Sequence, residues 1–518
     1  MINTWWVTRP KRKLNSIPEV LAILADVSLN QAWHGQRGTH LSLEEALESA
    51  NLKRTGERRD QTGGGGRTYV AWVASLGLVF TQQSTGNLKL TLAGEAIMNG
   101  DSPVEILKNQ VLKYQFPSAF SLSRGVKVSP RFKIRPFRFL LRLLMDEEIE
   151  YLTEEEIAKI IITNAENETE SCYKNVKEKL KAFRSLGDKS LEADFNAKYA
   201  PKTGKVNAEH PYSHLIDIAN TLMNWLEYTQ LAKRSEDHFI RVIYDKRTEI
   251  AEILNISTPF IDRPEQHEYY QRKYGLDPKH LKDTRNLTAT KTITANIIAE
   301  QKVKQAFIGE SLKTPITKIT TQLVDKIIEQ TGLEEKFVEE TLLRLYPHGA
   351  VGSFMTEYFE MAFKGRDEAT EFEKATTRLF NEVFGFESHH VGPIGLTPDV
   401  LIISDSAGYC GIIDNKAYSS YSISNDHHNR MVHNYIEGLN NYCASSNPLA
   451  FFSYIAGGFG NKINGQIMKI VNETGINGSA LSVSNVIRMV EKQQETPYSH
   501  TQIKDIFSLN RQVSLSDL

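Results

Sequence analysis

Apolar and polar residues follow two patterns along this chain, one typical of amphipathic helices and one of short, half-buried strands. The segment TYVAWVASLGLVF, at 68–80, predicts a helix that runs into a strand. A turn cluster at 84–87 separates it from LKLTL, an alternating run that predicts a second strand, and AGEAIMNG then opens another helix. The four glycines at 63–66 predict a flexible loop that leads into the first helix.

Residues 215–254 repeat this plan with almost no shared residues. The order is a helix, a strand, a turn, a strand and a helix, in the segments LIDIANTLMNWLEY, TQLAKR, SEDH, FIRVIYDK and RTEIAEILN. A helix followed by a hairpin and a second helix resembles a winged-helix module, which docks a helix in the major groove of DNA. The repeat therefore predicts two such modules.

Helical periodicity covers much of the remaining chain. Thr153 and Glu156, three residues apart, form a capping-box pattern at the start of one predicted helix. The polar stretch 195–213 predicts a loop, and 286–350 is again helical without recognisable chemistry, so it predicts a connector. Beyond the connector, an α/β pattern extends over about 372–490.

Length and composition place the chain among ordinary globular proteins. Its 518 residues suggest three or four domains of roughly 150 residues each. No apolar run approaches the ~18 residues that span a bilayer, and no apolar segment follows the basic N-terminus as in a signal peptide. Cys172, Cys410 and Cys443 are too far apart for a CxxC pair. We expect a cytoplasmic protein with reduced thiols and no membrane association.

The net charge of −2 conceals an asymmetry along the sequence. Residues 1–145 carry 20 Lys and Arg against 10 Asp and Glu, so the rest of the chain is acidic. A basic block joined to an acidic remainder indicates a polyanion-binding module attached to a second function. A solvated basic surface would give the same count.

The strongest candidate chemistry lies in the segment GLTPDVLIISDSAGYCGIIDNKAYSS. VLII and CGII are runs of strand length, and residues 404–408 between them predict a turn. Such a hairpin brings Asp399 beside Asp414, and it places Asp414 and Lys416 on the same face of one strand. A surface hairpin with solvated charges is the alternative.

Two carboxylates that converge at a strand end form an oxygen-ligand site suited to Mg²⁺. Phosphodiester hydrolysis uses such a site, because the metal polarises a phosphoryl oxygen and lowers the pKa of bound water. Lys416 could orient the attacking water or offset charge in the transition state. The sequence contains no GxxxxGK[ST], GxSxG or HExxH motif, which argues against a P-loop nucleotidase, an α/β-hydrolase and a zincin.

A predicted amphipathic helix, EFEKATTRLFNEVFGF, precedes this hairpin. Glu373 near its start could complete an acidic cluster, or it could simply be a first-turn glutamate that the helix dipole favours. The adjacent pairs His389-His390 and His427-His428 are expected in polar or DNA-facing roles, because neighbouring residues rarely bind one ion together.

The C-terminal region, about 350–518, resembles the cleavage domain of the type IIS restriction enzyme FokI. The resemblance runs in order through Glu373, PDVLII, GIIDNKAYSSYSI, NYIEGLNN and FFSYIAGGFGNKINGQIMKIV, and DNKAYSSYSI is its most specific part. It implies a PD-(D/E)XK nuclease domain in which Asp399, Asp414 and Lys416 are the catalytic triple and Glu373 assists. Asp399 and Asp414 would bind one or two Mg²⁺ ions.

The same resemblance implies self-association during cleavage. The segment 425–441, with Arg430, His433 and Asn434, is similar in position to FokI's dimerisation helix, although that enzyme's pairing Asp and Arg are not reproduced. A second copy of the chain is therefore an expected partner.

The N-terminal region, about 1–290, is similar to the AlwI family of type IIS endonucleases, which includes a nicking enzyme. The residues that carry this are LTLAGEAIMNGDSPVEILKNQVLKYQFPS, IRPFRFLLRLL, EEEIAKIIITNAEN and RPEQHEYYQRKYG. The family implies two N-terminal recognition subdomains, a helical linker and a C-terminal nuclease domain. It also implies short asymmetric DNA sites with cleavage a few base pairs to one side.

Basic residues around the two modules are the candidates for DNA contact, mostly to phosphate. An ordinary surface role is the alternative for each of them. They are Arg37, Arg54, Arg58, Arg59, Arg67, Arg124, Lys127, Arg131, Lys133, Arg135, Lys233, Arg234 and Arg241.

These patterns predict a multidomain, mainly α chain with winged-helix (α+β) recognition modules and an α/β nuclease domain around a mixed central sheet. The expected boundaries are 1–150 and 151–285 for recognition, 286–350 for the linker and 351–518 for the nuclease. The expected function is that of a Mg²⁺-dependent type IIS endonuclease acting on double-stranded DNA, with a cognate methyltransferase as its functional partner. A nicking enzyme and a winged-helix regulator with an inactive nuclease domain are the alternatives.

Overall fold

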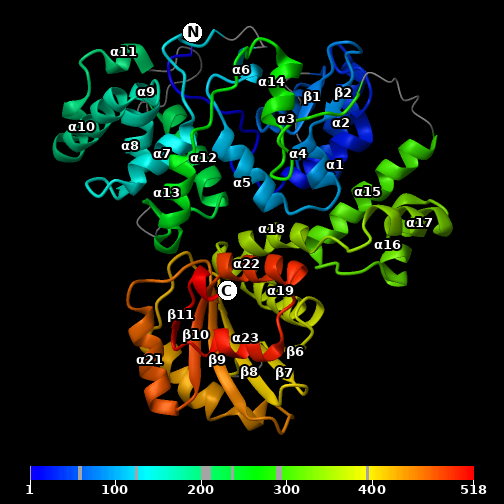
Figure 1. Ribbon diagram of the computed structural model, residues 1–518, viewed down its shortest axis with the longest axis vertical. Coiled ribbons are helices and arrows are strands. Elements are labelled where there is room, and N and C mark those ends of the chain that lie inside the picture. Colours follow the sequence, from blue (N-terminus) through cyan, green and yellow to red (C-terminus); the bar gives the residue numbers. More distant parts are fainter. Residues whose placement is uncertain are drawn as a thin grey trace. The chain divides into compact units, whose positions relative to one another are not determined.

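The computed structural model describes residues 2–55, 61–122, 127–199, 212–234, 239–287, 295–392 and 396–518, and the chain divides into two compact units (Figure 1). Unit 1 is Met1–Ile308 with 331–333, and unit 2 is Gly309–Gln330 with Glu334–Leu518. The division falls inside the predicted connector. None of the helices in the described ranges is long and apolar enough to cross a membrane.

The first part of unit 1 has the helix, hairpin and helix order that the sequence predicts. Strands β1 and β2 pair antiparallel, with Val79 opposite Leu90. The elements are α1 (Ile17–Ser28), α2 (Arg37–Ser49), α3 (Gly64–Ser75), β1 (Val79–Thr81), β2 (Leu88–Leu90), α4 (Leu92–Met98), α5 (Pro103–Lys113), α6 (Ala119–Leu122) and α7 (Pro136–Met145).

The prediction of a flexible loop at the four glycines 63–66 is wrong. Gly63 precedes α3 in a left-handed conformation (φ 80°), and the other three glycines form the first turn of that helix. Close packing on α2 explains them, since the Gly65 amide donates to Glu44 Oε2 (3.2 Å) and a side chain on Gly66 would collide with the carbonyl oxygen of His40.

The second part of unit 1 contains the repeated hairpin in a three-stranded sheet of order β3-β5-β4, so the sequence missed the short strand β3. The capping box of Thr153 and Glu156 is present. The elements are β3 (Tyr151–Leu152), α8 (Glu154–Glu156), η1 (Ile157–Ile161), α9 (Ile162–Asn164), α10 (Glu170–Leu186), η2 (Gly187–Ser190), α11 (Phe195–Tyr199), α12 (Ser213–Tyr228), β4 (Ala232–Arg234), β5 (Ile240–Val242), η3 (Tyr244–Lys246), α13 (Arg247–Asn255) and α14 (His267–Tyr274).

Two predictions in this part need correction. The polar loop expected at 195–213 begins instead with α11, because the rings of Phe195 and Tyr199 pack together (centroids 4.8 Å apart) and Phe195 is buried. The strand expected to include Tyr244–Lys246 ends earlier, and these residues form a 3-10 turn. Residues 200–211 and the predicted turn at 235–238 lie outside the described residues.

An aromatic cluster joins the two parts of unit 1 in one core. Trp225 of α12 stacks on Phe137 of α7, with centroids 5.9 Å apart, and meets Tyr114 edge-on at 6.1 Å. All three rings are fully buried. The helix that precedes the second hairpin is therefore fixed to the end of the first part by large apolar side chains.

Unit 2 contains the connector helices and an α/β domain. Three helices occupy the predicted connector, as expected: α15 (Ala295–Lys313), which begins in unit 1, α16 (Thr321–Thr331) and α17 (Glu335–Leu345). The α/β domain comprises α18 (Val351–Met361), η4 (Gly365–Glu368), α19 (Ala369–Glu382), β6 (Glu387–His390), β7 (Val400–Ser404), β8 (Tyr409–Lys416), α20 (Asn425–Asn429), η5 (Arg430–Ile436), η6 (Leu439–Asn441), β9 (Leu449–Ala456), α21 (Ile463–Thr474), β10 (Asn477–Ser482), α22 (Val483–Glu495), α23 (His500–Phe507), β11 (Arg511–Gln512) and η7 (Leu515–Asp517).

The six strands of this domain form one mixed sheet in the order β11-β10-β9-β8-β7-β6 (Figure 1). Strands β6, β7 and β8 are antiparallel neighbours, whereas β8 to β11 run parallel. The expected mixed central sheet is confirmed.

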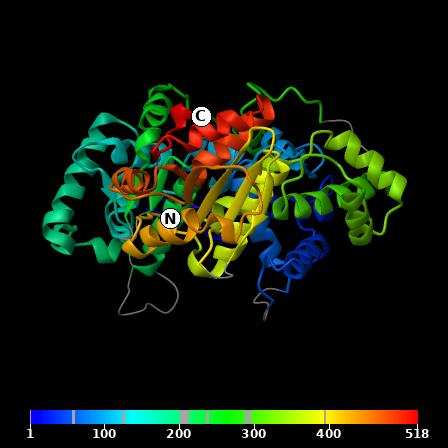
Figure 2. The ribbon, with the colours of Figure 1, turned by 90° about the horizontal axis from the view of Figure 1, so that it is seen from below.

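Helices cover both faces of this sheet (Figures 1 and 2). On one face, Ile413 and Val400 pack into a cluster with residues of α18, α19, α22 and α23. On the other, Ile412 and Leu401 pack with residues of η5 and α21. Burial on both faces explains why VLII and CGII are continuous apolar runs, and it holds the ends of β7 and β8 rigidly.

Candidate active site

The hairpin of β7 and β8 brings the two predicted aspartates together. Val400 pairs with Ile413 in antiparallel register, so Asp399, which directly precedes β7, lies beside Asp414 of β8. Asp399 Oδ2 accepts a hydrogen bond from the Asn415 backbone amide at 2.6 Å. The position of the first carboxylate is therefore fixed by the backbone of the second strand.

Lys416 completes the predicted trio. Its Nζ lies 2.6 Å from Asp414 Oδ2 and 4.0 Å from Asp399 Oδ2. Burial alone would lower the pKa of Lys416, but the negative charges of Asp414 and Asp399 raise it above its usual value. The lysine is thus held as a cation beside both carboxylates.

The carboxylate of Asp414 has one oxygen atom without a hydrogen-bond donor among the described residues. Within the described part of the chain, Asp414 Oδ1 is buried and accepts no hydrogen bond. Burial, together with the neighbouring charge of Asp414, raises the pKa of Asp399 well above its usual value. A buried, unpaired carboxylate oxygen beside a second carboxylate fits a hard divalent cation, which prefers oxygen ligands and retains several waters. No third acidic, His or Cys side chain of the described residues converges closely enough to complete a protein-only metal cage.

Glu373 lies on α19 at the side of this pair. Its Oε2 is 2.9 Å from Nε2 of His390, which lies on the neighbouring strand β6. The charge of Glu373 adds to the raised pKa of Asp399, behind burial and the charge of Asp414. The structure thus places Glu373 near the aspartates and gives it a histidine partner that the sequence did not indicate.

A buried polar chain behind the site was missed by sequence reasoning. The Asn415 side-chain amide donates to Thr376 Oγ1 at 2.6 Å, and the Tyr358 hydroxyl lies 2.9 Å from the same oxygen. Thr376 in turn donates to the Phe372 carbonyl (3.0 Å). The middle residue of the DNK triplet therefore ties β8 to α19. The sequence offered one indication of this contact: Thr376 lies three residues after Glu373, so both are expected on the same face of the helix.

The predicted basic residues fall into four groups. Some are engaged inside unit 1: Arg131 with Glu166 (2.7 Å), Arg135 with Glu168 (2.5 Å), Arg234 with Glu154, and Arg67 with the Thr62 carbonyl (2.6 Å). Lys233 is partly buried, and burial lowers its pKa. The exposed ones are Arg37, Arg54, Lys127, Lys133 and Arg241, whereas Arg58, Arg59 and Arg124 lie outside the described residues.

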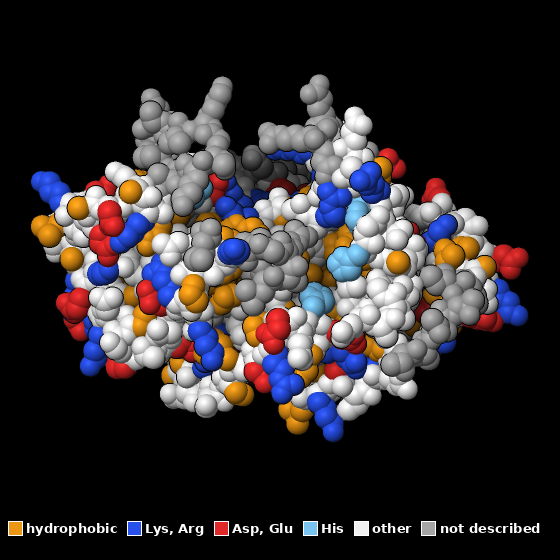
Figure 3. All heavy atoms as spheres, turned by 90° about the horizontal axis from the view of Figure 1, so that it is seen from above, with side chains coloured by type: hydrophobic (Ala, Val, Ile, Leu, Met, Phe, Trp, Pro, Cys, Tyr) orange, Lys and Arg blue, Asp and Glu red, His pale blue; other side chains and the backbone are white. Residues whose placement is uncertain are grey.

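The surface of one face of the molecule carries both signs of charge. Lys and Arg side chains there are interspersed with Asp and Glu instead of forming one continuous basic patch (Figure 3). Residues 1–145 have an excess of basic side chains. Acidic residues from later in the chain neutralise part of this charge, as in the pair of Lys108 with Glu249 (2.5 Å).

The three predicted dimerisation residues lie on η5. Met431, Val432 and Tyr435 of this segment are buried against the sheet. Arg430 pairs with Asp426 (2.9 Å) and His433 with Glu437 (3.1 Å) along the exposed side, where Asn434 is partly exposed.

Comparison with known proteins gives two matching family models. The model described as AlwI restriction endonuclease matches residues 74–346, more than half of the chain, and the model of the FokI cleavage domain matches residues 332–514. Together these matches define the class as that of the type IIS restriction endonucleases. Within this class, the chain belongs to the AlwI restriction endonuclease family. Both resemblances seen in the sequence are confirmed.

Individual relatives are distant. The type II restriction enzyme StsI of Streptococcus sanguinis is 24% identical over 148 residues, which cover 26% of this chain, and the match spans about a quarter (24%) of the length of StsI. Structures of FokI alone and bound to DNA each align with 99% of this chain and 100% of theirs, at 15% identity and a TM-score of 0.29. The BpuJ1 endonuclease binding domain, in complex with pyrene- and phenanthrene-modified DNA, aligns with 52% of this chain and 96% of its own, at 17% identity and a TM-score of 0.36.

Proposed function

We propose that this chain is a type II site-specific deoxyribonuclease that recognises a short asymmetric site in double-stranded DNA and cleaves a few base pairs to one side. The observation that carries the proposal is the set of Asp399, Asp414 and Lys416 at the shared end of β7 and β8, in which Asp414 is buried and the other two are partly buried. This hairpin beside α19 corresponds to a PD-(D/E)XK nuclease core, and the helix-hairpin-helix segments of unit 1 to winged-helix recognition modules.

Asp399 and Asp414 are the residues that would hold Mg²⁺, one or two ions, through their carboxylate oxygens. When bound, the ion polarises the phosphoryl oxygen and lowers the pKa of a coordinated water. Lys416, fixed by Asp414, places a permanent positive charge where the scissile phosphate develops negative charge, and it can orient the attacking water. Glu373, held by His390, adds a further carboxylate at the edge of this site.

A plasmid-cleavage assay with and without Mg²⁺ tests the proposal. We expect defined linear fragments in Mg²⁺ and unchanged supercoiled plasmid when EDTA removes the ion. Nicked plasmid as the sole product would favour the strand-specific nicking alternative. Unchanged plasmid in Mg²⁺, together with specific DNA binding, would favour a DNA-binding regulator with an inactive nuclease domain.

The partners follow from the same proposal. Double-stranded DNA is the substrate, and the exposed residues Arg37, Lys127 and Arg241 are candidates for phosphate contact. A second copy of the chain would join through the nuclease domain during cleavage. A cognate methyltransferase would protect the host DNA in the same cytoplasmic compartment, without binding this chain.

Thr376→Val tests the polar chain behind the site. The substitution leaves the buried Asn415 amide without its acceptor, and we expect the free energy of unfolding to fall by about 1–3 kcal/mol. Cleavage should fall by about 10-fold or more, because Asn415 also holds Asp399 through its backbone amide. Chemical denaturation and initial cleavage rates measure the two effects. Thr377→Val is the matched control, since the Thr377 side chain bonds to its own helix at the Glu373 carbonyl and to no other described residue. An equal loss in both variants would contradict the assignment.

A further inference from the structure

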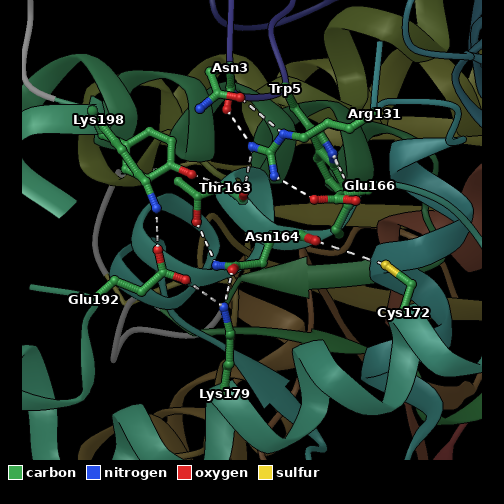
Figure 4. A network of polar contacts seen from close by, with 12 residues as sticks. Asn3, Trp5, Arg131, Thr163, Asn164, Glu166, Cys172, Lys179, Glu192 and Lys198 are labelled. Atoms are coloured by element: carbon green, nitrogen blue, oxygen red, sulfur yellow. Dashed lines mark hydrogen bonds and ion pairs between the residues drawn. The ribbon is translucent and has the colours of Figure 1, made fainter. Parts of the chain in front are cut away.

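A polar cavity of about 610 Å³ lies in unit 1, away from both hairpins (Figure 4). Its floor is one side of α10, where Ser171, Asn175 and Lys179 follow one another at four-residue spacing. The walls are the turn at 164–169, the loop that contains Arg131, and α11. The sequence predicted α10 only as part of a helical stretch. In the structure, this helix forms the base of a concave site.

The charged side chains of the cavity form ion pairs with one another. Arg131 donates Nε to Asn3 Oδ1 (3.0 Å), donates Nη2 to the carbonyls of Asn3 and Thr163 (2.8 Å each), and pairs through Nη1 with Glu166 (2.7 Å) (Figure 4). These bonds occupy most of the five donors of its guanidinium. Arg131 therefore fixes the wall of the cavity.

The two lysines of the cavity are held in the same way. Lys179 and Lys198 both pair with Glu192, at 3.1 and 2.7 Å (Figure 4). Lys179 also donates to Asn164, whose own amide nitrogen bonds to the Ile160 carbonyl (2.8 Å). Lys198 pairs with Asp194 as well (3.1 Å), so the three cations are matched by three carboxylates and the cavity has no net positive charge to attract phosphate.

Neutral hydrogen-bonding groups remain available for a ligand. Among the described residues, no hydrogen bond engages the exposed side chains of Ser171 and Asn175. Asn167 uses its carbonyl oxygen to accept from Thr169 (3.0 and 2.6 Å), and its amide nitrogen makes no bond to a described residue. Asn175 thus presents a complete amide, with both donor and acceptor, from the middle of a rigid helix.

The helix is firmly anchored behind this face. Tyr173, Val176, Leu180 and Phe183 of α10 are buried at helical spacing, and Thr169 caps its start by accepting from the Cys172 amide (3.3 Å). On the opposite side of the helix, Ser171 and Asn175 are exposed in the part of the chain that the structure describes, where they can meet the edge of a flat polar partner. An asparagine amide matches adenine, whose major-groove edge offers one acceptor and one donor side by side.

We propose that this cavity reads base edges in the DNA site and that Asn175 is a specificity-determining residue for an A·T base pair. The inference rests on the proposed endonuclease function. It adds to the winged-helix segments a third recognition element, α10, which contributes base selectivity and little phosphate affinity.

The test uses the full-length protein in EDTA, so that DNA is bound and not cut. The site is first defined by sequencing the ends of DNA cleaved by the wild type. Fluorescence anisotropy then gives Kd for a duplex with this site and for a random duplex. Asn175→Ala is expected to weaken binding to the site about 10–100-fold, with random-duplex affinity and the slope of log Kd against log salt unchanged.

A matched variant and a base-pair scan complete the experiment. Asn255→Ala removes an exposed asparagine at the end of α13, outside the cavity, and should bind as the wild type does. Replacing each A·T pair of the site by G·C should reveal one position where the wild type loses affinity and Asn175→Ala does not.

Three results would overturn the proposal in different ways. Equal site affinity for Asn175→Ala and Asn255→Ala would remove Asn175 from recognition. A loss on both duplexes with a shallower salt slope would make the cavity a phosphate contact. If the wild type neither binds nor cuts any DNA in a sequence-specific way, the endonuclease function itself fails, and the inference fails with it.

Discussion

Asp414→Ala should lose DNA cleavage by about a thousandfold or more while keeping sequence-specific DNA binding. The substitution removes the buried carboxylate that positions Lys416 and that offers an unsatisfied oxygen for a cation. Because Asp414 lies in unit 2 and the proposed recognition elements lie in unit 1, binding should be unaffected. Initial rates on a plasmid in Mg²⁺ and anisotropy on a site duplex measure the two properties. Asp399→Ala should behave in the same way.

Asp405→Ala is the control for this loss. Asp405 is an exposed carboxylate in the turn at the opposite end of the same hairpin, where it accepts from the Asn447 side chain (2.9 Å). We expect it to cleave at nearly the wild-type rate, and Glu373→Gln to have an intermediate rate. Full cleavage by Asp414→Ala would show that the catalytic site lies elsewhere.

Double-strand cleavage should depend on pairing of two chains. One set of Asp399, Asp414 and Lys416 faces one scissile phosphate, and a two-fold pair of nuclease domains matches the two antiparallel strands. If pairing is weak, doubling the enzyme concentration should raise the rate of linear-product formation by up to about fourfold. Quantifying nicked and linear plasmid over an enzyme titration measures this dependence.

A charge-reversing substitution on η5 also tests whether two chains pair during cleavage. Arg430→Glu places a negative charge beside Asp426 on the proposed pairing surface, so nicked product should accumulate. Arg488→Glu, an exposed arginine on α22 that pairs with Glu491 (3.4 Å), is the matched control. A rate strictly proportional to enzyme concentration, with nicked product alone, would support the nicking alternative.

The core of the candidate site could be predicted from the sequence because it is local. Two β-branched strands joined by the four-residue turn 405–408 determine their own pairing, so the spacing from Asp399 to Asp414 fixes which residues meet. The same reasoning held for the capped helix at Thr153 and for both hairpins of unit 1. In each case the pattern and the contact lie within about twenty residues.

Contacts between distant segments could not be predicted in this way. Asn415 meets Thr376 across 39 residues, and Arg234 meets Glu154 across 80. A sequence shows that an arginine is present, but not which carboxylate the fold brings to it, so DNA contact and an internal ion pair could not be distinguished. The glycines of α3 were predicted as a loop because their role depends on a second segment: they allow α3 to pack closely on α2.

The two outer strands of the mixed sheet are both short, and this limits how copies of the chain can associate. At one edge, β6 has four residues with polar side chains, Glu387 and His389 among them, and at the other β11 has two. Neither edge offers the long row of unpaired amide and carbonyl groups by which sheets of separate molecules merge or aggregate. A pair of nuclease domains would therefore be joined through side chains on helical surfaces, and such a contact can dissociate after each cut.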